Sequence, residues 1–359
     1  MIIINDLHIG AKRVAGTTPE SATRLRFYLQ ECFESILGSA DDDIAINGDF
    51  FDTHQVPLSD LLVSYSVIAD WLRSSGRRIY LLAGNHDLSK SSIELSSFEM
   101  MARLLIPLFP EQVVYMQGGG WVDEALGIYA ITHVVNQAEF DLQLERVPAE
   151  VKTLMLHCNF ASPFAEHADH SLNLTREAAK KLVERGVQII IGHEHHPSSF
   201  FGGKVMIPGN QFPSSVADCV TPEGRTVSEK HCLRINADGS VEKARTWQHT
   251  DDTGFVNIPW GQLEGQTLRD AEDFQGFIRV SGKAEPEEVA EALKRISRLR
   301  QKSQALVVAN AVRAITRDSG VEEIAESIDD VRKVDVVQLV LDTLTPAQAQ
   351  VVRAVLEKN

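Results

Sequence analysis

The chain has 359 residues, of which 43% are hydrophobic and 24% are charged, and this is the composition of an ordinary globular protein with room for two or three domains. Its net charge of −15 argues against a simple nucleic-acid binder, which would carry an excess of basic residues. No apolar run reaches the length of about 18 residues that a membrane span requires, and the start of the chain lacks the basic segment of a signal peptide. We therefore predict a cytoplasmic protein that does not enter a membrane. The four cysteines show no paired spacing, which favours reduced thiols.

The first predicted strand, residues 2–4, is followed at once by Asp6 and His8. Residues two apart in an extended segment point to the same side, so these two side chains can share a metal ion. Alone, an Asp-x-His pair is a common and weak signal. A helix is predicted to begin near Thr18, where a proline and an acidic residue follow a threonine.

The same arrangement of strand, glycine and polar cluster then occurs twice more. A strand at residues 43–47 leads to Gly48-Asp49, and a strand at residues 78–82 leads to Gly84-Asn85-His86-Asp87, with a helix at residues 59–73 between them. A carboxylate can bridge two cations and an imidazole cannot, so Asp49 is the candidate bridging ligand. Asp52 has two interpretations, as a partner of a ligand or as a cap of the next loop.

Because open α/β sheets place their sites outside the carboxyl ends of their strands, these clusters are predicted to meet at one edge. On its own, Gly84-Asn85-His86-Asp87 would be interpreted as a turn, since its residue types favour turns. Its recurrence in register with the two earlier clusters favours a site instead.

Two further histidine positions follow predicted strands. His157 ends a strand that begins at residue 151, and Gly192-His193-Glu194-His195 follows a strand at residues 187–191, after a helix at residues 175–185. Cysteine is absent from the combined ligand set, which argues against a structural zinc site. Three other histidines fit structural or exposed positions: His133 ends a predicted sheet region in which Gly118-Gly119-Gly120 forms a turn, and His167 and His170 lie in a polar loop.

The remainder of the chain carries no further ligand pattern. A hairpin is predicted at residues 231–247, a strand–helix–strand unit at residues 277–312, and two helices with apolar stripes at residues 331–359. These stripes either pack on the protein's own core or face a partner helix. We predict three domains, at residues 1–255, 256–325 and 326–359.

Five blocks of this sequence resemble the signature blocks of the calcineurin-like metallophosphoesterases, in the family's order and over about the first two-thirds of the chain. The blocks are Asp6-Leu7-His8, Gly48-Asp49-Phe50-Phe51-Asp52, Gly84-Asn85-His86-Asp87, His157 and Gly192-His193-Glu194-His195. The resemblance implies an αββα sandwich, in which two packed mixed sheets are flanked by helices. A small β-α-β capping domain and a C-terminal helical segment are implied more narrowly, by the similarity to the SbcD-type nucleases within this superfamily.

The resemblance further implies two divalent metal ions. Asp6, His8, Asp49 and His195 would hold one ion, and Asp49, Asn85, His157 and His193 would hold the other. His86 would act as the general acid, and Asp52 and Asp87 would support the ligands. Manganese is the implied metal, while the same ligands would accept magnesium, iron or zinc.

Within this superfamily the layout is most similar to the SbcD-type DNA repair nucleases of bacteria and phages. That similarity implies exonuclease and endonuclease activity on DNA, a homodimer, and a C-terminal segment that binds the coiled coil of an SbcC-type ATPase. Lys12 and Arg13, beside the first ligand pair, are the predicted phosphate contacts. Asn5 departs from the family pattern, which has a serine there, and the acidic net charge leaves the DNA-binding surface unlocated.

Two other functions remain open. A small-substrate phosphoesterase, acting on cyclic nucleotides or phosphomonoesters, would need neither the appended domain nor the amphipathic tail. A catalytically silent scaffold would not need every ligand position and His86 to be filled. A serine hydrolase and a P-loop NTPase are disfavoured, because the Gly-x-Ser-x-Gly and Gly-x-x-x-x-Gly-Lys-Ser/Thr motifs are missing.

Overall fold

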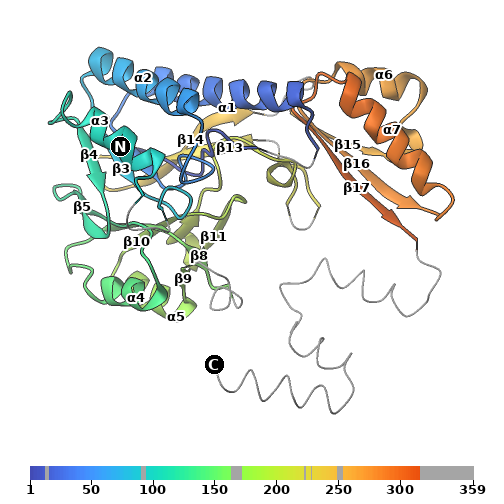
Figure 1. The fold of residues 1–359 in the computed structure, drawn as a ribbon. Coiled ribbons are helices and arrows are strands. Elements are labelled where there is room, and N and C mark those ends of the chain that lie inside the picture. The colour runs from blue at the N-terminus through green and yellow to red at the C-terminus, as the bar shows by residue number, and fades with distance from the viewer. Residues whose placement is uncertain are drawn as a thin grey trace, which may run out of the picture. The chain divides into compact units, whose positions relative to one another are not determined.

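The computed structural model describes residues 1–12, 16–89, 94–162, 172–221, 224–227, 229–248 and 254–315 (Figure 1). The predicted C-terminal helices, and with them Arg13, His167 and His170, lie outside these residues. The chain divides into two compact units, one of residues 1–282 and 291–312 and the other of residues 283–290 and 313–359. Within the described part, no helix combines the length and apolar character needed to cross a membrane. The three predicted domain boundaries stay predictions.

The first large sheet has the strand order β14-β13-β1-β2-β3-β4. Its four parallel strands are β1 (Ile2–Ile4), β2 (Ile44–Asn47), β3 (Ile79–Leu82) and β4 (Val113–Met116). The hairpin of β13 (Glu229–Ile235) and β14 (Val241–Gln248) joins it antiparallel to β1. One face packs against α1 (Pro19–Ser39), α2 (Leu58–Ser75) and α3 (Ser97–Leu105). The predicted helix start is confirmed, because Thr18 caps α1 and its hydroxyl accepts a hydrogen bond from the Ser21 amide.

The second large sheet has the order β11-β12-β10-β7-β6-β5. Its parallel strands are β6 (Ile128–Ile131), β7 (Thr153–His157), β10 (Gln188–Gly192) and β12 (Val205–Ile207). Antiparallel strands β5 (Gly119–Asp123) and β11 (Ser198–Phe200) form its edges. The predicted turn at Gly118-Gly119-Gly120 is wrong in part: only Gly118 has a positive φ, of 78°, and the next two glycines begin β5.

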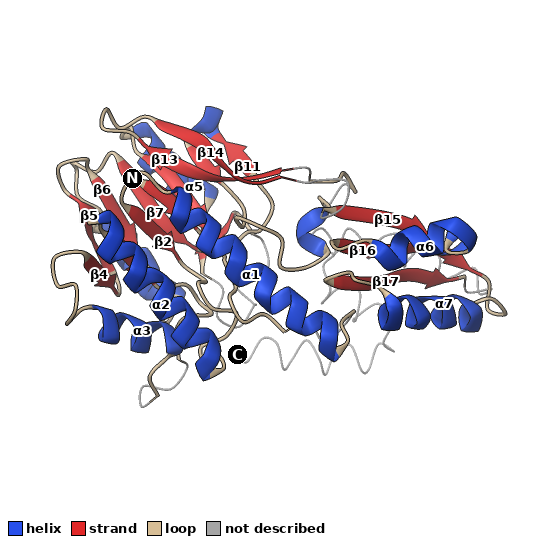
Figure 2. Cartoon of the chain, turned by 90° about the horizontal axis from the view of Figure 1, so that it is seen from above, coloured by secondary structure: helices blue, strands red, loops and turns tan. Residues whose placement is uncertain are grey.

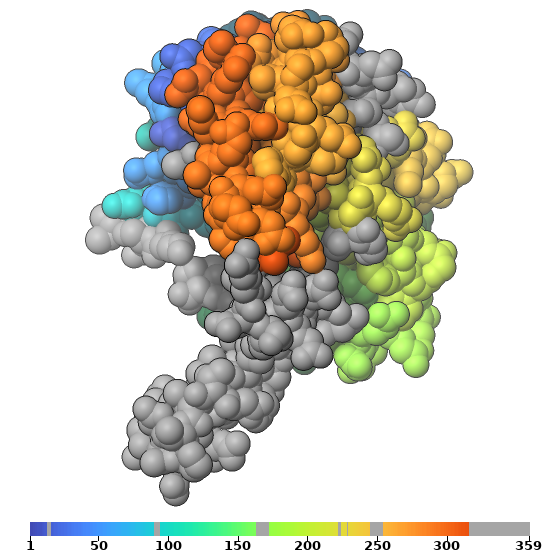
Figure 3. All heavy atoms as spheres, turned by 90° about the vertical axis from the view of Figure 1, so that its right-hand side faces the viewer, coloured from blue at the N-terminus to red at the C-terminus, as the bar shows by residue number. Residues whose placement is uncertain are grey.

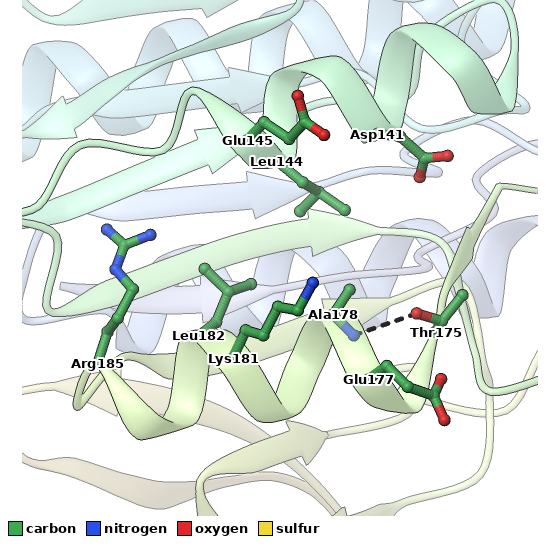
Figure 4. Close-up of a pocket in the computed structure, with 9 residues that line it drawn as sticks. All are labelled: Asp141, Leu144, Glu145, Thr175, Glu177, Ala178, Lys181, Leu182 and Arg185. Carbon is green, nitrogen blue, oxygen red and sulfur yellow. Dashed lines mark hydrogen bonds between the residues drawn. The ribbon is translucent and has the colours of Figure 1, made fainter.

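Helices α4 (Gln137–Glu145) and α5 (Arg176–Glu184) pack on the outer face of the second sheet. A groove between them is lined by Asp141, Leu144 and Glu145 on one side and by α5 residues such as Lys181 and Leu182 on the other (Figure 4). None of the predicted site residues lines this groove.

The two large sheets pack face to face, because their strands are apolar on both sides. In β1, Ile3 points into the space between the sheets, where it packs with residues such as Met155 and Ile190 of the second sheet. Its neighbours Ile2 and Ile4 belong to the cluster under the α1–α3 layer instead. This arrangement of helices, two mixed sheets and helices confirms the predicted sandwich.

A three-stranded sheet of order β15-β16-β17 follows, formed by β15 (Phe255–Pro259), β16 (Phe277–Ala284) and β17 (Val307–Ala314). Helices α6 (Gly265–Asp273) and α7 (Val289–Lys302) lie side by side on one face of it (Figures 2 and 3). The predicted strand–helix–strand unit therefore lacked one strand and one helix. The guanidinium of Arg24 on α1 donates to the carbonyls of Ser303 and Ala305, at 2.9 and 3.1 Å. The remaining short elements are β8 (Asn159–Phe160), β9 (Asn173–Leu174), η2 (Phe201–Gly203), η3 (Ala217–Cys219) and η4 (Trp260–Gln262).

Candidate metal centre

The carboxyl ends of strands from both large sheets meet at one place. Asp6 and His8 follow β1, Asp49 follows β2, and Asn85 follows β3 of the first sheet. The second sheet contributes His157 at the end of β7 and His193 and His195 after β10. The side-chain amide of Asn47 donates to the Leu156 carbonyl at 3.0 Å and so links the two sheets beside these ends.

The first ligand cluster consists of Asp6, His8 and His195, whose candidate ligand atoms all lie within 4.8 Å of one another. The Nε2 atoms of His8 and His195 are 3.0 Å apart. The Asp6 carboxylate also accepts the backbone N–H of His193, at 3.0 and 3.1 Å to its two oxygens. This contact couples the loop after β1 to the loop after β10.

The second ligand cluster consists of Asp49, His157 and His193. Asp49 Oδ2 lies 3.2 Å from His157 Nε2. The amide oxygen of Asn85 lies 3.1 Å from His157 Nε2 and 3.0 Å from His193 Nδ1, so Asn85 belongs to this group. Asp49 Oδ2 is also 4.0 Å from His8 Nε2, which places this carboxylate between the two clusters.

The donor atoms fit divalent metal ions. In the first cluster, His8 Nδ1 lies 3.2 Å from Asp52 Oδ1, and His195 Nδ1 lies 2.8 Å from Asp218 Oδ1. The proton that His195 Nδ1 shares with Asp218 leaves the Nε2 lone pair of His195 facing His8 Nε2, and a cation fits between these two nitrogens. Carboxylate, amide and imidazole donors together suit divalent metals of intermediate softness.

Four of the clustered residues have a left-handed backbone conformation. The φ angles are 54° at Asp6, 48° at His8, 50° at Asp49 and 93° at His193. Non-glycine residues rarely adopt this region, and it costs about 1–3 kcal/mol where it is imposed. Such strain is typical of residues whose side chains must point into a site.

Glycines make room for the second cluster. A Cβ atom on Gly48 would lie 2.0 Å from His157 Nδ1, and one on Gly84 would lie 2.3 Å from Asp49 Oδ1. A Cβ on Gly192 would lie 2.7 Å from the Asn47 carbonyl oxygen. That same carbonyl accepts a hydrogen bond from His157 Nδ1 at 2.9 Å and so directs Nε2 toward Asp49. The glycines noted in the sequence therefore permit close approach around one imidazole.

Charges within the centre shift the pKa values of its groups. Burial alone would lower the pKa of His157, but the adjacent Asp49 carboxylate outweighs it and raises the pKa to about 10. Burial alone would raise the pKa of Asp49, but His157 holds it well below its usual range. Burial and the charge of His157 lower the pKa of His193 to about 4. Because ligands bind metals in deprotonated form, metal binding at this cluster displaces protons.

His86 lies beside the clusters and remains partly exposed. Its side chain is 40% exposed, its Nε2 is 4.0 Å from Asp49 Oδ2, and its ring meets that of His8 edge-on at 5.1 Å between centroids. Its backbone N–H donates to Asp49 Oδ1 at 2.9 Å, and Nδ1 donates to the carbonyl of Asp52 at 2.5 Å. The imidazole is therefore oriented by the backbone, with Nε2 toward the centre.

The predicted supporting carboxylates occupy different positions. Asp87 is fully buried and accepts the backbone N–H groups of Phe50, Phe51 and Gly84, at 3.2, 3.1 and 3.0 Å. Asp87 thus joins the loops after β2 and β3. Burial, together with the negative charge of Asp49, raises the pKa of Asp87 to about 7. Asp52 contacts His8, in line with the first of its two predicted roles. Lys12 is exposed.

Two residues of the centre were missed by the sequence reasoning. Asp218, in η3, bonds His195, and Lys230, on β13, is fully buried and donates to the His195 carbonyl at 3.2 Å. Neither follows a parallel strand. The sequence offers one signal for Lys230, which is a single lysine within a predicted hairpin strand. An exposed lysine at a sheet edge would give the same pattern.

Comparison with protein families identifies the class. The sequence profile described as calcineurin-like phosphoesterase matches residues 1–206, a range that contains every predicted metal ligand. The chain belongs to this family, whose members are metal-dependent phosphoester hydrolases that bind divalent metal ions. No curated protein matches the chain.

Proposed function

We propose that this chain is a two-metal DNA nuclease, which hydrolyses phosphodiester bonds in repair or recombination as the nuclease subunit of a complex with an SbcC-type ATPase. The observation that carries the proposal is the convergence of two ligand clusters beside one exposed and oriented imidazole, His86. Asp6, His8, Asp49 and His195 hold one ion, and Asp49, Asn85, His157 and His193 hold the other. When bound, such a metal pair stabilises the charge of an in-line displacement and activates water at neutral pH.

His86 acts as the general acid in this proposal. The Asp52 carbonyl can only accept, so the His86 Nδ1 atom carries a proton and Nε2 faces the centre. In the protonated imidazolium, Nε2–H donates to the leaving oxygen while the carbonyl stabilises the positive charge. General acid catalysis of this kind contributes about 10²–10⁴ in rate.

DNA is favoured as the substrate because the chain continues well beyond the matched domain. The three-stranded sheet with α6 and α7, and the sequence of residues 326–359, follow a family match that ends at residue 206. A hydrolase of small phosphoesters needs neither addition. Lys12 and Arg13 follow the first ligand pair and offer positive charge to a phosphate backbone despite the acidic net charge.

A homodimer is supported by exposed apolar side chains on two adjacent helices. Leu58 and Leu62 of α2 are 66% and 47% exposed, and Met100 and Leu104 of α3 are 40% and 43% exposed. Spacings of four residues place each pair on one helix face. Exposed apolar stripes of this kind are typical of subunit interfaces. Sedimentation of the wild type and of a double variant, Leu62→Glu with Leu104→Glu, tests whether these helices form the dimer interface.

The ATPase partner is proposed from the sequence of residues 331–359, whose two apolar stripes suit a helical partner. Deleting these residues is expected to abolish binding to an SbcC-type coiled coil while the metal content stays unchanged. Loss of metal and of cooperative unfolding would instead assign the stripes to the protein's own core.

The proposed activity is tested with end-labelled linear duplex DNA and manganese, with and without an SbcC-type ATPase. His86→Ala is expected to lower the cleavage rate about 10²–10⁴-fold and to retain two metal equivalents. His54→Ala is the matched control, because the His54 side chain is similarly exposed, at 41%, and belongs to neither cluster. Cleavage of bis(p-nitrophenyl) phosphate but not of DNA in either condition would favour the small-substrate phosphoesterase. Two bound metals without any hydrolysis would favour the scaffold.

A further inference from the structure

We propose that Asp218 is a positioning residue that holds the His195 imidazole as a ligand of the first cluster, and that the buried Lys230 supports it. The inference rests on the proposed metal-binding role of His195. It assigns a function to two residues that lie outside the residues matched to the family.

Asp218 is built into the fold as an oriented anion. Its side chain is 3% exposed, and its Oδ1 atom accepts from His195 Nδ1 at 2.8 Å. Its other oxygen accepts three hydrogen bonds, from Ser214 N at 2.8 Å, Ser214 Oγ at 3.0 Å and Ser215 N at 2.8 Å. A carboxylate with four donors is both satisfied in its hydrogen bonding and fixed in direction.

This contact sets the tautomer of His195. An ionised carboxylate can only accept, so the Nδ1 atom of His195 carries the ring proton and the Nε2 atom keeps its lone pair. That Nε2 atom is the one that lies 3.0 Å from His8 Nε2 in the first cluster. A carboxylate behind a ligating imidazole also raises its basicity and strengthens the bond to a metal.

Lys230 holds the backbone of the same ligand. Its side chain is fully buried, and Nζ donates to the His195 carbonyl at 3.2 Å and to Asn210 Oδ1. A buried ammonium is costly unless it is paired and hydrogen-bonded, and its charge interacts favourably with that of Asp218. His195 is thus restrained at its ring by an anion and at its main chain by a cation.

Among the residues that the structure describes, the second cluster has no equivalent arrangement. His157 is oriented by the neutral carbonyl of Asn47, and His193 Nδ1 faces the amide oxygen of Asn85. Loss of the Asp218 charge should therefore weaken one of the two metal positions and leave the other intact. A residue with a merely structural role would not produce this selectivity.

The test is a calorimetric titration of metal-free protein with Mn²⁺. Asp218→Asn keeps the shape of the side chain and removes its charge. We expect one of the two binding events to weaken about 10–100-fold, the range typical of lost partners behind metal ligands, and the other to keep its wild-type affinity. In ¹⁵N NMR of the metal-free proteins, the His195 ring is expected to be a single Nδ1–H tautomer in the wild type and a mixture of the two tautomers in Asp218→Asn.

Ser214→Ala is the second variant, in case Asp218→Asn does not fold. It removes one donor to the far oxygen of Asp218 and keeps the contact to His195, so the same binding event is expected to weaken less than about 10-fold. Wild-type affinity for both ions in Asp218→Asn, or equal weakening of both, would overturn the inference. If wild-type protein binds two ions but cleaves no DNA, the proposed nuclease function fails while the role of Asp218 stands.

Discussion

The two ligand clusters hold similar side chains by different physical means. In the first cluster, His8 and His195 each have a carboxylate at the ring nitrogen that faces away from the centre. In the second cluster, His157 has a backbone carbonyl there and is surrounded by glycines whose missing Cβ atoms make room for its ring. One cluster therefore depends on charge and the other on close packing.

This difference determines which substitutions each cluster tolerates. The first cluster should respond to changes of charge that preserve shape, such as Asp to Asn. The second should respond to the addition of a single methyl group, because the atoms nearest to a Cβ on Gly48 belong to the His157 ring, which the Asn47 carbonyl holds in place. Asp49 belongs to both, since its Oδ2 lies 3.2 Å from His157 and 4.0 Å from His8.

The largest expected effect comes from Asp49→Ala, which removes the carboxylate between the clusters. Both metal ions should be lost, because a bridging ligand belongs to both positions. Elemental analysis of the purified variant after dialysis measures this directly. Two full equivalents of metal in Asp49→Ala would contradict the bridging assignment and would make the clusters independent.

The second-largest effect is expected from Gly48→Ala. The new Cβ would lie 2.0 Å from His157 Nδ1 at a position with a φ of 88°. Overpacking and backbone strain together should lower the free energy of unfolding by about 2–5 kcal/mol, as measured by urea denaturation of metal-free protein. The ion of the second cluster should be lost first.

Gly76→Ala separates these two causes. Gly76 also has a positive φ, of 66°, but a Cβ there would meet nothing within 4 Å. We expect a loss of about 1–2 kcal/mol from backbone strain alone and unchanged metal content. Equal losses in the two variants would show that packing around His157 is unimportant.

The smallest expected effect is that of Asp52→Asn in the first cluster. Asp52 contacts His8 Nδ1 at 3.2 Å with a side chain that is 13% exposed, whereas Asp218 contacts His195 at 2.8 Å and is 3% exposed. A longer and better solvated contact contributes less, so the affinity of one metal ion should fall less than about 10-fold. A larger loss than in Asp218→Asn, measured in the same titration, would reverse the ranking of the two carboxylates.

The recurring pattern of strand, glycine and polar residues allowed the convergence of the ligand residues to be predicted from sequence, while the sandwich was implied by the resemblance of five sequence blocks to a known family. Parallel strands bring their carboxyl ends to one edge, so residues such as Asp6, Asp49 and Asn85 meet without further information. Asp218 and Lys230 could not be predicted in this way. Their positions depend on how η3 and β13 pack behind His195, which is a tertiary contact without a local signal.

The elements missed outside the site have a similar explanation. Strand β15 spans only Phe255–Pro259, and a short apolar run fits a strand or part of a helix equally well by its pattern. Helix α6 contains a glycine at its first position and has no side-chain cap, so the usual start signals are absent. Gly119 and Gly120 fit a turn by composition, yet pairing with Ile131 and Ala130 makes them part of a strand.

The left-handed backbone at Asp6, His8 and Asp49 has a consequence for engineering this protein. Glycine at any of these positions would relieve an unfavourable conformation, so selection for heat resistance alone would tend to accept such replacements while abolishing metal binding. Stabilised variants should therefore be sought with these positions held constant. Robustness and reactivity compete at these three residues and also at His193, which shares the left-handed conformation.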